Sequence, residues 1–226
     1  MTTCADADRI KELEDDNQRL RRLLDQRDAP GELRHRLRGT FALLSTVIRR
    51  SVQTSRDQAS YADHLEDRVD AIARAQVLAD RIGEVSLHTV LADELLKYGV
   101  TESDRVAVSG PELFFQPKAG QMLALAIHEL TINSVEHGAL GSSNGRVVVR
   151  WSVSNLKPDP LLTISWSEPE IRIDAQPSHA GFGTEMLTRM LSYELKGNST
   201  IIYDDGGLNC TMHIPMPTRI GRVGLP

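Results

Sequence analysis

Two long helical patterns follow one another between residues 32 and 82, and they constrain the fold more than any other feature of the chain. Each pattern places apolar and small side chains within a narrow arc at about 100° per residue, and a polar break near residues 54–57 separates them. The first arc holds Leu33, Leu37, Thr40, Leu44, Val47, Ile48 and Ser51, and the second holds Tyr61, Leu65, Val69, Ile72, Gln76 and Ala79. The sequence therefore predicts a helical hairpin. One hairpin cannot bury both stripes, so we expect a homodimer that forms a four-helix bundle.

A shorter apolar pattern precedes the hairpin, in residues 1–30. Its apolar positions recur at heptad spacing, with Asn17 at the intervening seam position. This spacing favours a coiled-coil-like signalling helix, and a plain amphipathic helix is the alternative. The pattern ends at Pro30 and Gly31.

The pattern changes after Gly83, where short alternating segments and shorter helices replace the long stripes. We expect a strand entry followed by a helix over 85–98, helices near 120–137 and 183–195, and strands near 106–108, 113–115, 146–154, 161–166, 199–203 and 208–215. Helices mixed with mostly antiparallel strands predict an α+β chain, with one layer of helices over one sheet in an α/β sandwich. The expected domains are residues 1–30, the hairpin 31–83, an α/β-sandwich domain 84–217 and a flexible tail 218–226.

The composition limits the kinds of partner that the protein can bind and the cellular compartment in which we expect it. The net charge of −5 and the pI near 5.8 argue against nucleic-acid binding. Cys4 and Cys210 are the two cysteines and lack metal-ligand spacing, which fits a reducing cytosol. No run of about 18 apolar residues occurs, so we expect a cytoplasmic protein without a membrane segment.

Four motifs occur in one order along the chain. They are Glu32-Leu33-Arg34-His35-Arg36, the run His128-Glu129-Leu130 with Asn133 and His137-Gly138-Ala139-Leu140, the tripeptide Trp166-Ser167-Glu168, and Gly181-Phe182-Gly183-Thr184. In this order they resemble the HWE histidine kinases, over about residues 32–215. The resemblance implies a dimerisation and phosphotransfer hairpin followed by a Bergerat-fold ATP-binding domain, the type shared with gyrase-like ATPases.

His35 lies on the first helix, about 160° or more around it from Leu33 and Leu37, and so points away from the buried stripe. A neutral imidazole there can attack phosphorus with one ring nitrogen. A surface histidine of no special role is the alternative from the residues alone. The resemblance implies that His35 carries the phosphoryl group.

Glu129 and Asn133 are four residues apart and share one face of their helix. By resemblance, Asn133 binds Mg²⁺ and Glu129 acts on a nearby proton or a metal-bound water. The same resemblance places His128 in the ATP site, although a histidine on an apolar helix is often a satisfied core residue.

Two further segments complete the ATP site by resemblance. Glu168 is expected to accept the exocyclic amine of adenine, while Trp166 on the same side of the strand is expected in the core. Gly181, Gly183 and Thr184 are expected beside the phosphates, with residues 169–180 as a lid.

The resemblance predicts a sensor histidine kinase core that autophosphorylates His35 with Mg-ATP and passes the phosphoryl group to an Asp of a response regulator. Two departures from the family keep an alternative open. Pro169-Glu170 stands where the family has glycines, and Glu136 stands where it has a lysine. The alternative is a phosphotransfer protein or dimeric scaffold that binds ATP weakly or not at all. A gyrase-like ATPase or serine kinase is a third reading, which leaves the His35 hairpin unexplained.

Overall fold

The computed structural model describes residues 31, 37–51, 58–101, 105–154, 160–169, 181–204 and 207–224. His35, the expected coiled coil and the expected lid from residue 170 to 180 lie outside these residues. The chain divides into two compact units, Met1–Leu43 and Leu44–Pro226. In the first unit the described residues are helical. The sheets and the helices from α2 onward belong to the second unit.

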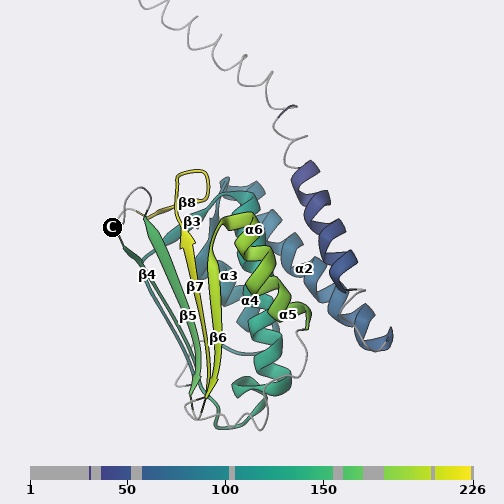
Figure 1. The fold of residues 1–226 in the computed structure, drawn as a ribbon, viewed down its shortest axis with the longest axis vertical. Helices are drawn as coiled ribbons and strands as arrows, with labels where there is room; N and C mark the ends of the chain where they lie inside the picture. Colours follow the sequence, from purple (N-terminus) through teal and green to yellow (C-terminus); the bar gives the residue numbers. More distant parts are fainter. Residues whose placement is uncertain are drawn as a thin grey trace, which may run out of the picture. The chain divides into compact units, whose positions relative to one another are not determined.

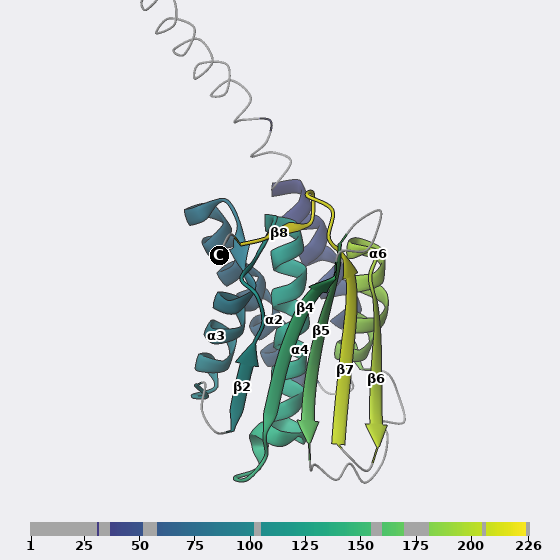
Figure 2. The same ribbon diagram turned by 90° about the vertical axis from the view of Figure 1, so that its left-hand side faces the viewer.

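A five-stranded sheet forms one layer of the second unit (Figure 2). Its order is β2-β4-β5-β7-β6, and only β2 and β4 run parallel among these neighbours. The strands are β2 (Val106–Ser109), β4 (Val147–Ser154), β5 (Leu161–Pro169), β6 (Asn198–Asp204) and β7 (Gly207–Pro215). Side chains of β5 alternate between buried and half-buried, so one face of this strand packs under the helices. This arrangement confirms the predicted α+β class.

A second, smaller sheet has the order β1-β3-β8. It joins β1 (Val85–Ser86), β3 (Leu113–Phe115) and β8 (Gly221–Val223), and all its pairs are antiparallel. The flexible tail expected over residues 218–226 is therefore wrong for residues 221–223. Ile220 is buried just before β8, and this apolar anchor with the ladder to β3 holds the segment in place.

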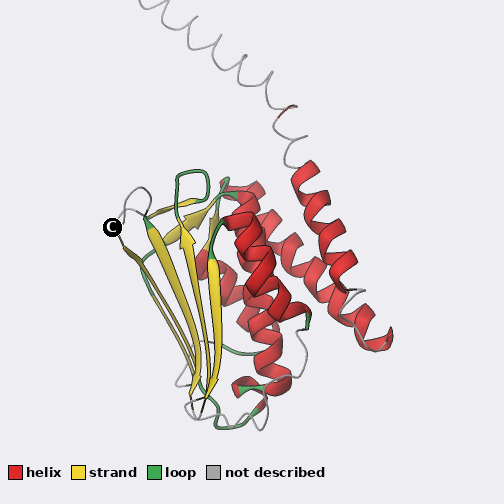
Figure 3. Cartoon of the chain, in the orientation of Figure 1, coloured by secondary structure: helices red, strands yellow, loops and turns green. Residues whose placement is uncertain are grey.

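Helices cover one face of the large sheet, as the separation of helix and strand colours in Figure 3 makes plain. They are α3 (Leu87–Lys97), α4 (Pro117–His137) and the segment of α5 (Phe182–Glu185), a π-helical turn (Met186–Met190) and α6 (Leu191–Leu195). A short 3₁₀ helix (Ala139–Gly141) follows α4. The helix expected over residues 183–195 is thus present, and its π turn was not predicted because such turns leave no periodic signal.

The central helix α4 is buried along most of its length. Fifteen of its 21 residues are buried, which places it between the sheet and further helices. Pro117 stands in its first turn, where a missing N–H costs nothing. A Cβ on Gly120 would lie 2.5 Å from the Val85 side chain, so the helix approaches β1 too closely for any larger residue.

Helix α2 (Gln58–Ile82) packs against α4 on the side away from the sheet (Figure 1). Ile72, Ala75 and Ala79 are buried along the predicted stripe. Polar side chains add contacts to the neighbouring helices: Arg74 pairs with Glu94, Gln76 accepts from Gln121 at 2.6 Å, and Asp67 pairs with Lys97 at 2.6 Å. The predicted domain boundary at Gly83 stays a prediction, and α2 belongs to the same compact unit as the sheet.

The other half of the predicted hairpin is helical over residues 37–51. Val47 and Ser51 of the second unit are buried, whereas Ile48 of the same predicted stripe is 45% exposed. Among the described residues, no helix has the length and apolar character needed to cross a membrane.

Cys210 in the middle of β7 gives a test of this core. Burial raises the pKa of its thiol to about 12. The thiolate is the reactive form, so in a Cys4→Ser chain at pH 8 we expect a thiol reagent to label the folded protein at least about a thousandfold more slowly than the urea-unfolded protein.

The same shift fixes the pH dependence of stability. Because the folded pKa lies above the unfolded value, the contribution of Cys210 is complete below about pH 8.5 and is lost as the pH rises toward 12. Urea unfolding of Cys4→Ser, with and without Cys210→Ala, measures it. Equal labelling in the folded and unfolded states would contradict the buried position.

Candidate active site

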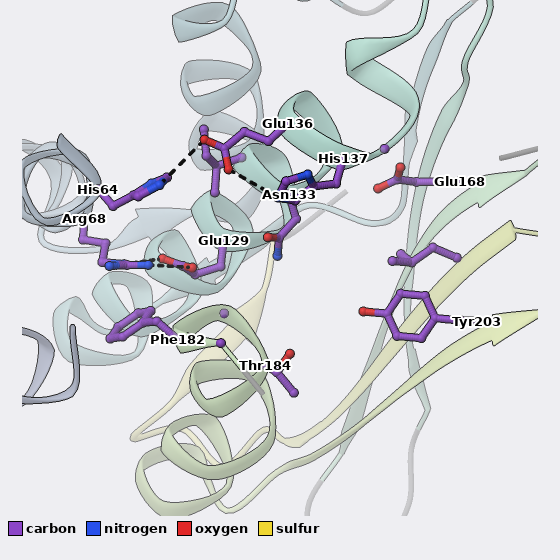
Figure 4. Close-up of a pocket in the computed structure, with 15 residues that line it drawn as sticks. His64, Arg68, Glu129, Asn133, Glu136, His137, Glu168, Phe182, Thr184 and Tyr203 are labelled. Atoms are coloured by element: carbon purple, nitrogen blue, oxygen red, sulfur yellow. Dashed lines mark hydrogen bonds and ion pairs between the residues drawn. The ribbon is translucent and has the colours of Figure 1, made fainter. Parts of the chain in front are cut away.

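A cavity of about 420 Å³ opens at the C-terminal half of α4. Its walls come from α2, α4, the start of α5 and the ends of β5, β6 and β7 (Figure 4). Six residues predicted for the ATP site line it together: Glu129, Asn133, Glu168, Gly181, Gly183 and Thr184. Further lining residues are His64, Arg68, Ile132, Glu136, His137, Gly138, Phe182, Tyr203 and Leu208. The fold thus brings together motifs that lie up to about fifty residues apart.

Glu129 is held by an arginine from outside the motifs. Arg68 of α2 donates from Nε to Glu129 Oε1 at 2.7 Å and from Nη2 to Oε2 at 3.2 Å. Both side chains are buried, at 10% and 3% exposure, so the pair is a bidentate, desolvated ion pair. The guanidinium also lies 3.8 Å from the centre of the Phe182 ring and donates to Ser51 Oγ at 3.2 Å. Both carboxylate oxygens of Glu129 therefore accept a hydrogen bond from Arg68.

Asn133 lies one turn further along α4 and is exposed to the cavity. Gly183 packs directly against these two side chains. A Cβ on Gly183 would lie 3.0 Å from both Asn133 Nδ2 and Glu129 Oε2. Gly181, in contrast, has open space around its Cβ position and an extended backbone. A methyl group at Gly183 would therefore press on the Asn133 and Glu129 side chains, whereas one at Gly181 would not.

Glu168 stands on the opposite side of the cavity, at the end of β5 (Figure 4). Its Oε1 accepts from Trp166 Nε1 at 2.8 Å, and its Oε2 accepts from the backbone N of Ala139 at 2.7 Å. Trp166 is 1% exposed, as expected for a core residue. A Cβ on Gly138 would lie 2.2 Å from Glu168 Oε2, so glycine leaves room for the carboxylate. The Trp-x-Glu spacing thus buries a tryptophan that fixes the glutamate.

Tyr203 of β6 faces the same end of the cavity and was not predicted. Burial first, with the Cys210 and Glu168 charges adding to it, raises the pKa of its phenol. The hydroxyl therefore stays protonated at neutral pH, so it can donate a hydrogen bond toward a ligand.

His128 is buried outside the cavity lining. Its Nδ1 lies 2.7 Å from Glu94 Oε1 on α3, and the second oxygen of Glu94 pairs with Arg74 of α2. The direct ATP contact implied for His128 stays a prediction that this geometry does not favour. The observed placement matches the other interpretation, a satisfied core histidine.

Glu136 has two histidines near it. His64 Nε2 of α2 and His137 Nε2 each lie 3.7 Å from one of its carboxylate oxygens. Glu136 is exposed, so solvent screens its charge.

Sequence reasoning missed Arg68 and Tyr203 because neither lies in a motif. Arg68 left one signal: it precedes Ile72 by one turn and so lines up with the apolar stripe of α2. A charged residue in such a position needs a buried partner.

The chain is similar in sequence to known histidine kinases. A sequence model of the HWE histidine kinase family matches residues 32–112. A blue-light-activated histidine kinase of Rhizobium johnstonii is 31% identical over 189 residues, which cover 81% of this chain and 52% of the relative. Blue-light-activated histidine kinase 1 of Erythrobacter litoralis is 31% identical over 200 residues, covering 84% and 54%. The chain spans about half the length of these curated relatives.

Solved structures show the same fold. A blue-light activated histidine kinase of Erythrobacter litoralis matches with a TM-score of 0.56 and 15% identity over 80% of this chain and 59% of that one. Its histidine kinase domain matches with a TM-score of 0.51 and 15% identity over 79% and 96%. The chain therefore shares its fold with these histidine kinase structures. Residues 32–112 match the HWE histidine kinase family, and most of the chain is similar in sequence to blue-light-activated histidine kinases.

The two glycines before α5 give a matched test. We expect Gly183→Ala to weaken Mg-ADP binding about tenfold, because the added methyl displaces Asn133 and Glu129, and small displacements of positioned groups are costly. Gly181→Ala should keep the melting temperature of the wild type, since its Cβ position is open. Isothermal titration and thermal unfolding measure the two effects. Wild-type binding by Gly183→Ala would show that this packing does not position the site.

Proposed function

We propose that this chain is the catalytic core of a two-component sensor histidine kinase. It binds Mg-ATP in the cavity, transfers the γ-phosphoryl group to His35, and passes it to an aspartate of a response regulator. One observation carries the proposal: a cavity in a chain that matches the HWE histidine kinase family over residues 32–112 gathers Glu129, Asn133, Glu168 and Gly183 from three separate motifs.

The residues that line the cavity suit a nucleotide, which has a base at one end and phosphates at the other. The fixed Glu168 carboxylate and the Tyr203 hydroxyl offer an acceptor and a donor at one end, which suits the edge of an adenine base. Asn133 at the other end presents a side-chain amide to the cavity. Its oxygen is a hard ligand of the kind Mg²⁺ takes, and bound Mg²⁺ would neutralise phosphate charge.

The proposed transfer forms one bond and breaks one bond in each step. A ring nitrogen of neutral His35 forms a bond to the γ-phosphorus, the bond to the β-phosphate oxygen breaks, and ADP leaves with the electron pair. The ring then gives up the proton of its other nitrogen to solvent. In the second step a carboxylate oxygen of the response regulator forms the bond to phosphorus, and the His35 nitrogen leaves and regains a proton.

A homodimer and a response regulator are the proposed protein partners. Leu37 and Phe41 of the first unit lie one turn apart on the same helix face and are 47% and 64% exposed. An apolar face of this kind supports association of two hairpins into a four-helix bundle.

Incubation with γ-labelled ATP and Mg²⁺ tests the proposal. We expect acid-labile label on the wild type and loss of nearly all label in His35→Ala and in Asn133→Ala, because the first lacks the acceptor and the second lacks the metal ligand. His88→Ala and Asn198→Ala are the matched controls, since both residues are exposed and lie outside the cavity lining. Both controls should label like the wild type.

Each result of this labelling experiment favours a different candidate function. Wild-type protein that takes no label from ATP, but accepts phosphate from a phosphorylated response regulator through His35, would favour the phosphotransfer alternative. Label that persists in His35→Ala would exclude His35 as the acceptor. ATP hydrolysis that is unchanged in His35→Ala, without labelled protein, would favour a gyrase-like ATPase.

A further inference from the structure

Helix α2 contributes two side chains to the cavity, although the motifs that define the nucleotide site lie on other elements. His64 and Arg68 both line it, beside Glu129, Asn133 and Glu136 (Figure 4). These neighbours form the end of the cavity opposite Glu168. Under the proposed function, on which this inference rests, that end takes the phosphates.

Without α2, the described lining of the cavity would carry carboxylates and no permanent cation. Among the described lining residues, three carboxylates face one guanidinium, and no lysine is present. The carboxylates belong to Glu129, Glu136 and Glu168, and the guanidinium to Arg68. A di- or triphosphate adds further negative charge. The permanent cation at the described part of the cavity therefore comes from the hairpin helix.

Several contacts hold the Arg68 side chain in place. Its guanidinium is bidentate on Glu129, rests on the Phe182 ring and donates to Ser51, and it is nearly excluded from water. Further along α2, Arg74 is tied to Glu94, which also binds His128. The adjacent residues His128 and Glu129 of α4 thus each lead to an arginine of α2. These two buried clusters fix where α2 docks along α4, and therefore where Arg68 lies beside the cavity.

We propose that Arg68 is a nucleotide-site residue supplied by α2, which provides the fixed positive charge at the phosphate end and positions Glu129. Phosphate binding then depends on the docking of α2 on α4. Any movement of the hairpin that withdraws Arg68 removes the cation from the phosphates, leaves Glu129 without its buried partner and frees the Phe182 ring at the start of α5. The nucleotide site is in this way sensitive to the position of the hairpin.

Mg-ADP and adenosine binding to the full chain test this role. We expect Arg68→Met to weaken Mg-ADP binding about tenfold to a hundredfold, the size expected for one charge near the phosphates at an effective dielectric constant of about 20. Adenosine carries no phosphate, so its affinity should change less than about twofold. The Mg-ADP affinity of Arg68→Lys should lie between those of the wild type and Arg68→Met, because lysine keeps the charge but loses the bidentate geometry. Titration calorimetry serves for Mg-ADP, and ligand-observed NMR serves for adenosine.

Two further variants guard the interpretation. Arg81→Met removes a positive charge from an exposed position on the same helix and should bind both ligands like the wild type. If Arg68→Met does not fold, Arg68→Met with Glu129→Gln removes both members of the buried pair and is measured against Glu129→Gln alone. The additional loss of Mg-ADP affinity should again be about tenfold or more.

Three results would overturn the inference. They are equal loss of adenosine and Mg-ADP affinity in Arg68→Met, unchanged Mg-ADP affinity in that variant, and absence of Mg-ADP binding by the wild type. Equal loss would mean that Arg68 only holds the wall of the cavity. A wild type that binds Mg-ADP but leaves His35 unlabelled would contradict the proposed function alone, and the charge effect of Arg68 would still support the inference.

Discussion

The burial of α4 is the constraint on which the rest of the structure depends. The helix packs on the sheet with one face and on α2 and α3 with another, so its buried polar residues cannot reach water, whereas Asn133, Glu136 and His137 near its C-terminal end are exposed. His128 and Glu129 are both buried, and each has a charged partner from a neighbouring helix. Because an unpaired buried charge is costly, these two residues fix where α2 and α3 can dock. Core packing and site geometry are therefore decided by the same helix.

The two sides of the cavity are held by different means. Glu168 receives hydrogen bonds from a tryptophan two residues earlier on its own strand and from the backbone after α4, and Arg105 steadies that loop by donating to Gly145 O at 3.1 Å. This side is rigid because its donors belong to the sheet and to a backbone turn. The Glu129 side is held by Arg68 across two packed helices. Its geometry therefore follows the packing of α2.

Much of the fold was predictable because its signals are local. The expected helix over residues 58–82 agrees with α2 at both ends, and the expected strands at 146–154 and 161–166 agree with β4 and most of β5. Alternation on β5 also predicted that Trp166 and Glu168 share a face. The ordered segment at residues 221–223 was missed, because its partner β3 lies about a hundred residues earlier and such pairing leaves no trace in a three-residue sequence.

By itself the sequence determined which residue types stand at which spacing: the helical stripes, the strand alternation, and the motifs that carry the family resemblance. It also placed Glu129, Asn133, Glu168 and Gly183 in one site, and the cavity contains all four. Only the tertiary structure decided that Arg68 pairs with Glu129, that His128 bonds to Glu94, and that a methyl group would press on neighbouring side chains at Gly183 but not at Gly181. The physical reason is that burial and ion pairing join residues distant in the chain, while periodicity reports only on neighbours.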